Sequence, residues 1–578
     1  MEEKKIAMTG ISGYKNIKLK SWLQFLIVVA GIILLSTAGS FLRFRYDLTE
    51  DKRFTLSEST HRVLNHLKND IYIEVYLDGE IPIPMKRLKR SVGDILDEFR
   101  LASGHRIDYE FINPSGAKDT RQRENQYQTL VKKGLIPIRL EAGDAEGGST
   151  QKIIFPGMIV NYNGIEVPVN FLENNQAIPY EQNILHSMEG LEYEMIQTIA
   201  TLSSDTVKKV AFIEGQGEIP EIETADITYN LAKFFTIDRG TISGKPGILD
   251  KYSAVIIAGP EKVFSESDKL VLDQYIMNGG KVLWLIDEVA VNSDSLVYGE
   301  TVGLYRPLNI EDQLFRYGAR INPMIVQDME CVPIRLMVMS GGTRQQAVSL
   351  PWVYYPLLKP SSAHPITRNL NRVEGEFVNY IDTVGLDPAI KKKILLSTSE
   401  FSRTVSPPVI IRLKEAELPL VKKEFNKQNL PVAVLLEGIF PSAFKNRSIA
   451  NLTEEKNLRI RTDSKRTRMI VIADADIIRN EVRRSGLEET PLPLGKDKYT
   501  LQEYGNKDFL INCLNWLVDN TGIMELRSRE LKLRLLNKNE IKTQRLKWQV
   551  INIAGPILIV ILGGLLYSYF RRRNYTRY

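Results

Sequence analysis

The sequence predicts an α/β protein that is anchored in a membrane at both ends. Two uncharged apolar runs, at 22–42 and 550–570, are each 21 residues long, and a helix of about 20 such residues crosses the hydrocarbon of a bilayer. Between them, short apolar strand patterns alternate with amphipathic helical patterns, which is typical of α/β folds. At 578 residues the chain exceeds one usual domain, and we predict two, residues 47–205 and 206–522.

The composition is that of an ordinary globular protein, with 43% hydrophobic and 25% charged residues. This balance excludes a disordered chain and a polytopic channel. The formal net charge of +6 gathers near the two ends, which indicates membrane flanks and not a nucleic-acid surface. The two cysteines, Cys331 and Cys513, lack the spacing of a metal or redox motif. Whether they pair stays open, and cysteine usage leaves the compartment undecided.

The first apolar run is interpreted as an uncleaved anchor, because it is too long for a signal peptide and lacks a small-residue cleavage pattern. Two spans place both termini on one side of the membrane. Lysines in residues 1–21 and arginines in residues 571–578 predict that these segments are cytoplasmic. Residues 523–549 are also basic, but long domains cross largely regardless of charge. We therefore predict transmembrane helices at 22–42 and 550–570, with the large domain on the far side.

The first domain, residues 47–205, opens with a strand, a helix and a strand: "IYIEVYLDG" at 71–79, "MKRLKRSVGDILDEFRLAS" at 85–103 and "RIDYEFINP" at 106–114. Short strands around the turn "AGDAEGGS" follow, and a helix at 185–204 closes the domain. This order resembles the thioredoxin-like fold. The redox function of that fold needs a C-x-x-C after the first strand, where this chain reads "DGEIPIPMK". Redox chemistry is therefore excluded.

The second domain, residues 206–522, repeats short apolar strand patterns. They read "VAFIE", "AVIIAG", "KVLWLID", "INPMIVQD", "KILLSTS", "PVAVLLEG" and "RMIVIADAD". A helix at 265–278, capped by a serine and ended by Gly279 and Gly280, lies between two of them. Fully apolar strands that alternate with helices predict a parallel, doubly wound sheet.

The stretch at 259–287 resembles the amidotransferase-like (flavodoxin-like) fold of class I glutamine amidotransferases. In those enzymes a catalytic cysteine lies in the turn after the equivalent strand. Here that turn reads Asp287-Glu288-Val289, and the nearest cysteine, Cys331, lies in another setting. The scaffold is expected without its nucleophile.

Two glycine patterns partly match nucleotide-binding motifs. "GTISGKP" at 240–246 has three residues between its glycines and Pro246 after the lysine, so it fails the phosphate-loop pattern and is predicted to be a turn. "EGQGE" at 214–218 lacks the third glycine of a dinucleotide fingerprint. The histidines are scattered, and only His61 and His66 are close, at poor spacing for one metal ion. The sequence thus supplies no catalytic residue, cofactor site or metal site.

Acidic residues end several predicted strands, and in open α/β sheets ligands bind beyond the carboxyl ends of the strands. A group there would hold a cation or a polar ligand. The alternative, which we favour, is that each carboxylate caps the helix that follows it. With the "EGQGE" loop included, the candidate ligand edge comprises Glu214, Gln216, Glu218, Asp287, Asp328, Asp474 and Asp476.

The stretch that leads to the second span is strongly basic. Residues 506–522 predict an apolar helix that contains Cys513 as a small hydrophobic residue. In residues 523–549, basic and apolar residues then alternate. A stalk against a partner, an amphipathic segment on lipid headgroups and a solvated linker all remain open for this stretch.

The connector "RYDLTEDKRFTLSEST", directly after the first span, resembles the opening of the gliding-motility-associated ABC transporter auxiliary proteins of the GldG family. "KKVAFIEGQGE", "YPLLKPSSAHPIT", "PVAVLLEGIFPSAF", "MIVIADADIIRN", "NKDFLINCLNWL" and "WQVINIAGPILIVILGG" extend the resemblance over nearly the whole chain. The chain departs from the family at Gln216, where the family often has a histidine. Within the connector, Ser57 is the candidate helix cap, with Thr60 in the same turn.

The resemblance implies partners and a place in the cell. These are a polytopic ABC permease and a separate P-loop ATPase in the inner membrane of Bacteroidota-like bacteria, with the large domain in the periplasm. The family's "substrate-binding" label fits poorly with a chain held at both ends, which suits a non-enzymatic scaffold or coupler better. The alternative is an envelope ligand-binding receptor or hydrolase-like enzyme that uses the acidic edge. The transported substrate and the stoichiometry stay open.

Overall fold

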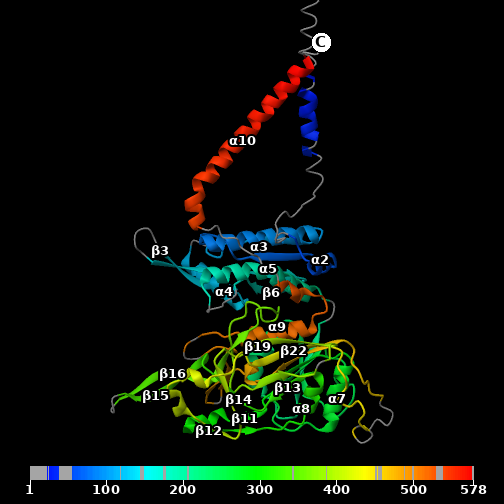
Figure 1. The fold of residues 1–578 in the computed structure, drawn as a ribbon, viewed down its shortest axis with the longest axis vertical. Coiled ribbons are helices and arrows are strands. Elements are labelled where there is room, and N and C mark those ends of the chain that lie inside the picture. The colour runs from blue at the N-terminus through cyan, green and yellow to red at the C-terminus, as the bar shows by residue number, and fades with distance from the viewer. Residues whose placement is uncertain are drawn as a thin grey trace, which may run out of the picture. The chain divides into compact units, whose positions relative to one another are not determined.

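The computed structural model of the protein describes most of the chain (Figure 1). The described residues are 22, 23, 25–34, 36, 37, 55–116, 119–143, 149–172, 178–204, 207–340, 344–385, 387–449, 452, 459–486, 488–497, 500, 502–528 and 538–575. They divide into two compact units, Met1–Ser528 and Arg529–Tyr578. The predicted cytoplasmic segment 1–21 and the connector at 45–54 lie outside the described residues.

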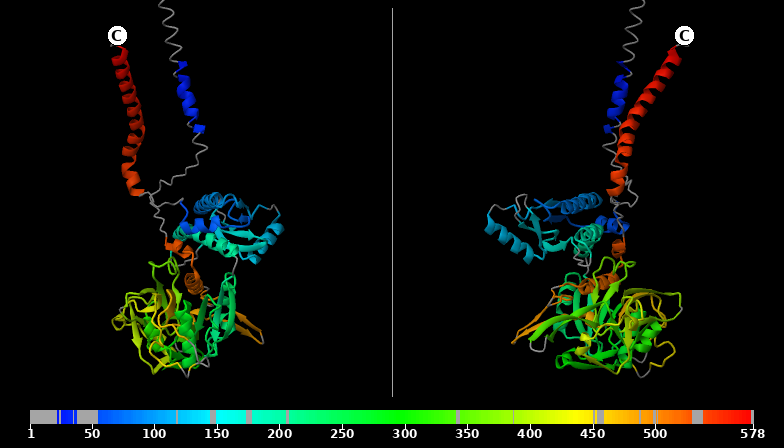
Figure 2. Two further views of the ribbon diagram at one scale, coloured as in Figure 1. Left: turned by 90° about the vertical axis from the view of Figure 1, so that its right-hand side faces the viewer. Right: turned by 60° about the vertical axis from the view of Figure 1, so that its left-hand side comes forward.

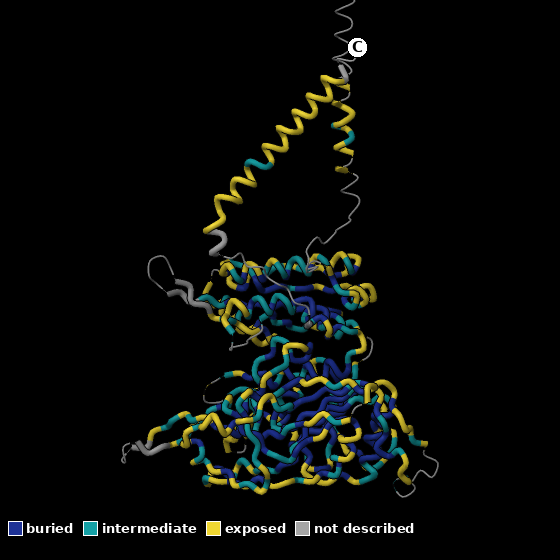
Figure 3. The backbone as a smooth tube through the Cα atoms, in the orientation of Figure 1, coloured by how far each residue is buried: buried dark blue, intermediate teal, exposed yellow. Residues whose placement is uncertain are grey.

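One long apolar helix makes up the second unit. Helix α10, Lys538–Tyr575, contains the predicted span at 550–570, and its stretch Thr543–Arg573 is long and apolar enough to cross a membrane. Its residues there are almost all exposed (Figure 3). Because no part of its own unit covers this surface, α10 is a candidate membrane anchor.

The predicted first span is described only in part. The apolar helix Phe25–Leu34 is shorter than a membrane span requires, and residues 38–42 lie outside the described part of the chain. Of the described helices, α10 alone therefore meets the length and composition of a span.

The first domain is built on a four-stranded sheet in the order β2-β1-β5-β6. β1 and β2 are parallel, and β5 and β6 are antiparallel, as predicted for a β-α-β start followed by short antiparallel strands. The elements are α2 (Glu58–Asn65), β1 (Ile71–Val75), α3 (Ile83–Ala102), β2 (Ile107–Phe111), α4 (Thr120–Lys132), the hairpin β3 (Ile138–Gly143) and β4 (Ser149–Ile154), β5 (Gly157–Tyr162), β6 (Ile165–Asn170) and α5 (Tyr180–Ser203).

Successive side chains along each strand point to opposite faces of this sheet. Helices cover both faces. Ile73 of β1 and Val160 of β5 face the core made with α3 and α5, which pack against each other (Figure 2). Ile159 of β5 faces the other way, toward Leu130 of α4.

Helix α2 begins where the sequence predicts. The hydroxyl of Ser57 accepts a hydrogen bond from the N–H of Thr60 (3.0 Å) and donates one to the hydroxyl of Thr60 (2.9 Å). Glu192 of α5 holds the same turn, because its carboxylate accepts from the N–H of Ser57 (2.9 Å). The predicted cap is confirmed.

The second domain is built on a ten-stranded sheet. Its parallel half has the order β8-β7-β9-β10-β23, and β22, β19, β16 and β15 continue it with antiparallel pairings. The strands are β7 (Lys209–Glu214), β8 (Thr236–Thr241), β9 (Ala254–Ala258), β10 (Val282–Leu285), β15 (Cys331–Ser340), β16 (Arg344–Pro360), β17 (Val373–Glu374), β19 (Ile390–Ser397), β22 (Pro431–Gly438) and β23 (Thr467–Ile472).

The prediction of a wholly parallel sheet is therefore wrong. β19 and β22, which the strand patterns placed in it, pair antiparallel. The predicted strand "INPMIVQD" splits into β13 (Ala319–Asn322) and β14 (Ile325–Asp328), which pair with β18 (Tyr380–Thr383) and β20 (Ser402–Val405) outside the main sheet. An apolar run shows that a strand is buried but not in which direction it runs.

Helices lie on both faces of the parallel half. Phe212 of β7 belongs to the core that contains Ile227 and Phe509, whereas Ile213 belongs to the core that contains Leu272 and Leu314. The helices are α6 (Ala225–Leu231) and α9 (Asn506–Val518) on the first face, and α7 (Glu266–Met277) and α8 (Glu311–Tyr317) on the second. The doubly wound arrangement is thus confirmed for this half of the sheet.

The remaining elements are short. They are β11 (Val289–Val291), β12 (Glu300–Tyr305), β21 (Val409–Arg412), β24 (Val482–Ser485), β25 (Glu488–Pro491) and the 3-10 helices η1 (Glu221–Thr224), η2 (Ser293–Tyr298), η3 (Leu413–Glu417), η4 (Lys422–Glu424), η5 (Asp476–Ile478) and η6 (Ile523–Ser528).

Candidate functional site

Two neighbouring strands bring predicted acidic residues together. β10 and β23 run parallel with Leu285 opposite Ile472, so Asp287 and Asp474, each two residues further on, leave the sheet at one edge. One carboxylate oxygen of Asp287 accepts a hydrogen bond from the N–H of Ala475 (2.8 Å). The strand-end pattern therefore located a real group of carboxyls.

Two further carboxyl groups, those of Asp476 and Glu376, belong to this edge, and Glu376 comes from a distant loop. Asp474 is buried and accepts a hydrogen bond from the N–H of Asp476 (2.9 Å) and, through its other oxygen, from the N–H of Glu376 (3.1 Å). Glu376 follows β17, and no local pattern in the sequence marks it. Asp287, Glu376, Asp474 and Asp476 are called the acidic cluster below.

Burial changes the protonation of the acidic cluster, because an ionised carboxylate loses hydration inside the protein. Burial and then the charge of Asp476 raise the pKa of Asp287 to about 7 and the pKa of Glu376 to about 8. The pKa of Asp474 is raised well above its ordinary value for the same reasons. At neutral pH the cluster therefore retains protons and does not carry four full charges.

Arg479 supplies positive charge beside the cluster. Its Nη1 lies 2.7 Å from Oδ1 of Asp476 and its Nε 3.3 Å from a carboxylate oxygen of Glu223. The first contact is close but lacks hydrogen-bond geometry, so it acts as an ion pair. The charge of Arg306 also lowers the pKa of Asp287 against the effect of burial. The cluster is thus partly neutralised by the chain itself.

Apolar side chains pack closely around Gly259, beside the acidic cluster. Gly259 follows β9 with φ +62°, and a Cβ atom there would lie 2.9 Å from Cγ1 of Ile219 and 3.1 Å from Cβ of Ala475. Ile219 is buried, and its N–H donates to the carbonyl oxygen of Ala258 (3.0 Å). In an open α/β sheet this edge is the usual place for a ligand, and here Ile219 and Ala475 pack against Gly259 within it.

The Gly259→Ala substitution tests this packing. We expect it to lower the free energy of unfolding by about 1–3 kcal/mol, because the added methyl group meets Ile219 and the positive φ is strained. Thermal denaturation measures the loss. The second change Ile219→Ala should recover part of it, and strictly additive losses would contradict the close contact.

The "EGQGE" loop forms a separate, internally bonded turn after β7. The carbonyl oxygen of Gln216 accepts hydrogen bonds from the N–H groups of Glu261 (2.8 Å) and Lys262 (2.7 Å). The N–H of Gln216 donates to Glu218 (2.9 Å), and its side-chain amide donates to Asp268 (3.3 Å). These contacts give the loop a structural role at the start of α7.

Glu214 and Asp328 have other partners. Glu214 lies 3.3 Å from Arg239, whose guanidinium also donates to Thr224 (2.6 Å). Asp328 ends β14, outside the main sheet, and accepts hydrogen bonds from the N–H (2.7 Å) and the hydroxyl (2.5 Å) of Ser399. Of the seven predicted residues, the structure therefore brings three together: Asp287, Asp474 and Asp476.

The described part of the chain contains potential metal ligands and two cysteines. Among those residues, no three His, Cys, Asp or Glu side chains gather as metal ligands would. Cys331 and Cys513 are both free, and Cys513 is buried in the core as predicted. Burial raises the pKa of the Cys331 thiol to about 12, so this thiol is a weak nucleophile at neutral pH.

The segment that follows α9, residues 519–528, is called the junction segment. The carboxylate of Asp519 accepts hydrogen bonds from the N–H groups of Thr521 (2.6 Å), Gly522 (3.2 Å) and Met524 (3.1 Å). One side chain thus sets the path by which the chain leaves the second domain.

The junction segment also contacts the first domain. The carbonyl oxygen of Thr521 accepts hydrogen bonds from the hydroxyl of Ser59 (3.1 Å) and the guanidinium of Arg62 (3.0 Å), both on α2. The hydroxyl of Tyr193 on α5 donates to the sulfur of Met524 (2.9 Å). The junction segment is therefore bonded to α2 through Thr521 and to α5 through Met524.

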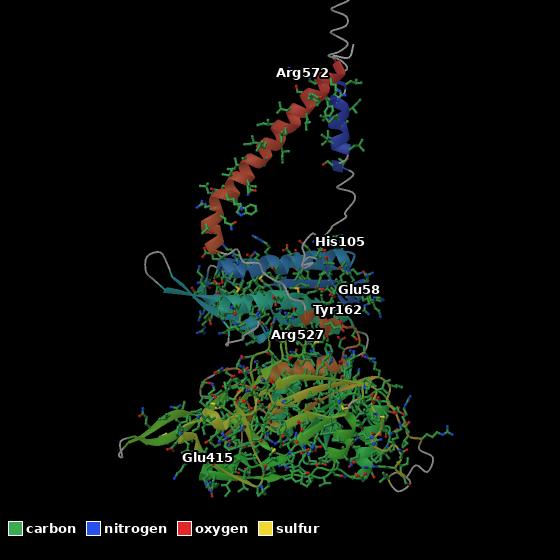
Figure 4. The ribbon with its side chains drawn as sticks, viewed as in Figure 1. Glu58, His105, Tyr162, Glu415, Arg527 and Arg572 are labelled. Atoms are coloured by element: carbon green, nitrogen blue, oxygen red, sulfur yellow. The ribbon has the colours of Figure 1, made fainter. Side chains whose placement is uncertain are left out.

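Arg527, labelled in Figure 4, joins both domains at the end of the junction segment. Its guanidinium donates to the side chain of Asn512 on α9 (3.0 Å) and to the carbonyl oxygen of Arg368 (3.3 Å). It also lies 3.9 Å from Glu194 and over the ring of Tyr193, both on α5. Only 13% of its side chain is exposed, so these partners surround most of the guanidinium.

Comparison with known proteins adds a family. Residues 207–513 match the family model of an ABC-type uncharacterized transport system, and residues 50–161 match a domain of unknown function. An uncharacterized protein of Borreliella burgdorferi is 21% identical over 550 residues, which cover 92% of this chain and 94% of that protein.

One solved structure, the mmIFT52 N-terminal domain, is 14% identical. It covers 54% of this chain and 98% of that chain at a TM-score of 0.31, which is too low to assign a fold. The transport-system model, in contrast, spans more than half of the 578 residues, including β7, the acidic cluster and most of α9. The chain belongs to this family of ABC-type transport systems.

Proposed function

We propose that the protein is a non-enzymatic, membrane-anchored accessory subunit of an ABC transporter. The family match over residues 207–513 carries this proposal. Helix α10 supports it, because Thr543–Arg573 has the length and composition of a membrane anchor. Its partners are then a polytopic permease and a separate P-loop ATPase, as the resemblance to the GldG family implies.

The junction segment supports a scaffolding or coupling role. It links the chain that leads toward α10 to both α2 and α9, through Thr521 and Arg527. The last described residues of the folded unit are therefore bonded to both of its domains. In this proposal the subunit holds the permease and transmits movement, and ligand binding is not its main role.

The finer placement follows from the same resemblance and from the terminal charges. We propose two spans, cytoplasmic termini and a periplasmic folded unit in a complex associated with gliding motility. The lysines of residues 1–21 and the arginines of residues 571–578 support this orientation.

The two domains are also proposed to share known folds. The parallel pair β1 and β2 around α3, with antiparallel β5 and β6, supports a thioredoxin-like first domain. The parallel order β8-β7-β9-β10-β23, covered by helices on both faces, supports an amidotransferase-like second domain.

The double substitution Asp287→Asn and Asp474→Asn separates this function from an enzyme or receptor that uses the acidic cluster. Asparagine keeps the shape and the acceptor oxygens of both groups. We expect transporter assembly and the cellular phenotype to persist unchanged in a strain that carries the variant. Loss of the phenotype with assembly intact would favour the enzyme or receptor.

A further inference from the structure

The three-stranded sheet β11-β12-β21 has one apolar face that is open to solvent. Val302 of β12 pairs with Ile410 of β21, and Leu304 lies two residues further along β12, so these side chains share one face. Val302, Ile410 and Leu304 are 46%, 47% and 53% exposed. The residues that alternate with them, Thr301 and Ile411, are buried. Val302, Leu304 and Ile410 are called the outer face below.

The fold of this sheet does not require apolar side chains on its outer face. An antiparallel sheet with one face in water normally carries polar residues there. Just before β12, which lies beside β11 in the second domain (Figure 1), Val297 and Tyr298 of η2 are 84% and 91% exposed. Single exposed apolar residues are ordinary, but a group of neighbours is typical of a surface that another molecule covers.

One ion pair borders the outer face. Nε of Arg412 lies 3.3 Å from Oε2 of Glu300, and the two side chains are 52% and 63% exposed. They pair across β21 and β12, two residues from Ile410 and Val302, and therefore share the outer face. Surfaces that bind anionic lipid headgroups are rich in lysine and arginine, whereas this border has one charge of each sign. The outer face is thus complementary to a surface that also combines an acid, a base and an apolar centre.

A second copy of the chain offers such a surface. A two-fold axis that runs along the strands, between β12 and β21, places Glu300 opposite Arg412 of the second copy. The same axis places Val302 opposite Ile410 of the second copy, because both pairs lie in register across the two strands. Every contact then occurs twice, as in an isologous dimer. Two sheets that pack in this way lie about 10 Å apart with their strands nearly aligned.

We propose that two copies of this chain pair through the outer face of β12 and β21. Burial of Val302, Leu304 and Ile410 supplies the favourable free energy, and the contacts between Glu300 and Arg412 of opposite copies set the orientation. The pairing concerns the folded unit and does not depend on the proposed transporter role.

The test uses the full-length chain, purified alone in mild detergent in two differently tagged forms. Glu300→Arg leaves two arginines at the border, and Arg412→Glu leaves two glutamates. Each variant alone should pair roughly tenfold more weakly than the unsubstituted chain, because like charges then face each other across the axis. Light scattering during size-exclusion chromatography measures the copies in each particle over a dilution series.

Mixing the two variants separates contacts between copies from contacts within one copy. Both variants lose the ion pair within the chain, but in a mixed pair every arginine faces a glutamate of the other copy. An equimolar mixture should therefore recover the pairing of the unsubstituted chain, and a pull-down through one tag should recover the other variant.

Two further changes serve as controls. Lys445 and Asp463 form another exposed ion pair of the second domain, with Nζ 3.2 Å from Oδ1, and Lys445→Glu or Asp463→Lys should leave pairing unchanged. Val302→Asp should weaken pairing while the midpoint of thermal unfolding changes little, because this side chain is already half exposed.

Three outcomes would overturn the proposal. These are an unsubstituted chain that stays as single copies at micromolar concentration, charge variants that pair as well as the unsubstituted chain, or a mixture that pairs no better than its components. Single copies of the unsubstituted chain, together with loss of permease and ATPase from the Val302→Asp variant, would assign the outer face to a transporter partner instead.

Discussion

Replacing Asp287 by Asn is expected to stabilise the protein strongly at pH 8 and much less at pH 5. The pKa of Asp287 rises from 3.8 to about 7 on folding, because burial and the charge of Asp476 disfavour the carboxylate. Asparagine cannot ionise, yet it keeps an oxygen to accept the hydrogen bond from Ala475.

The direction of this pH effect on stability follows from proton binding at Asp287. Between pH 3.8 and about 7 the folded state holds more protons at Asp287 than the unfolded state does. Its contribution to stability is therefore present at low pH and is lost as the pH rises through this range. The gain from Asp287→Asn should grow by about 2 kcal/mol between pH 5 and pH 8.

Thermal or chemical denaturation in detergent at the two pH values measures the difference between variant and wild type. Taking this difference cancels the contributions of other groups to the pH dependence. One of them is His364, whose pKa is lowered to about 4, so that its contribution to stability is lost as the pH falls. The Asp70→Asn change, at an exposed site, is the matched control for the substitution itself. A gain from Asp287→Asn that is equal at both pH values would contradict the buried, proton-holding cluster.

The second large effect is expected at Arg527. The Arg527→Ala change leaves the side chain of Asn512 and the carbonyl oxygen of Arg368 without their donor and removes the charge beside Glu194. Partners that are left buried and unpaired cost more than the bond itself contributes. We expect a loss of about 3 kcal/mol in the free energy of unfolding.

The position of Arg527 between the domains gives a second readout. Hydrogen exchange in α5 should accelerate, because Arg527 lies over Tyr193 and beside Glu194. Arg527→Lys keeps the charge without the planar fork and should fall between wild type and alanine. Arg316→Ala, at an exposed site on α8, is the matched control. Unchanged exchange in α5 with Arg527→Ala would show that the junction segment does not hold the two domains together.

Local signals in the sequence were reliable where the structure depends on neighbouring residues. The cap of α2 at Ser57 and the start of α7 at Ser265 each rest on a bond three residues away. The turn at the end of α7 is confirmed as well, since Gly279 has φ +99°. The convergence of Asp287 and Asp474 could be predicted because parallel strands end at one edge.

Features that depend on distant contacts could not be predicted. Glu376 reaches the acidic cluster only through a contact between distant parts of the chain, the hydrogen bond from its N–H to Asp474. The strand patterns of β19 and β22 did not show their antiparallel direction, since burial on both faces makes either direction look alike. Residues 523–528 resembled the start of a basic stalk, but Met524 is buried and Arg527 nearly so, because α5 and α9 supply their partners.

The measurement that tests the central claim most directly is purification of the tagged full-length chain from its own membranes in mild detergent, with mass spectrometry of what accompanies it. The predicted result is stoichiometric recovery of a polytopic permease and a P-loop ATPase. The Asp287→Asn and Asp474→Asn double variant should recover the same partners. Recovery of the chain alone, stable and monodisperse, would contradict a role as a transporter subunit.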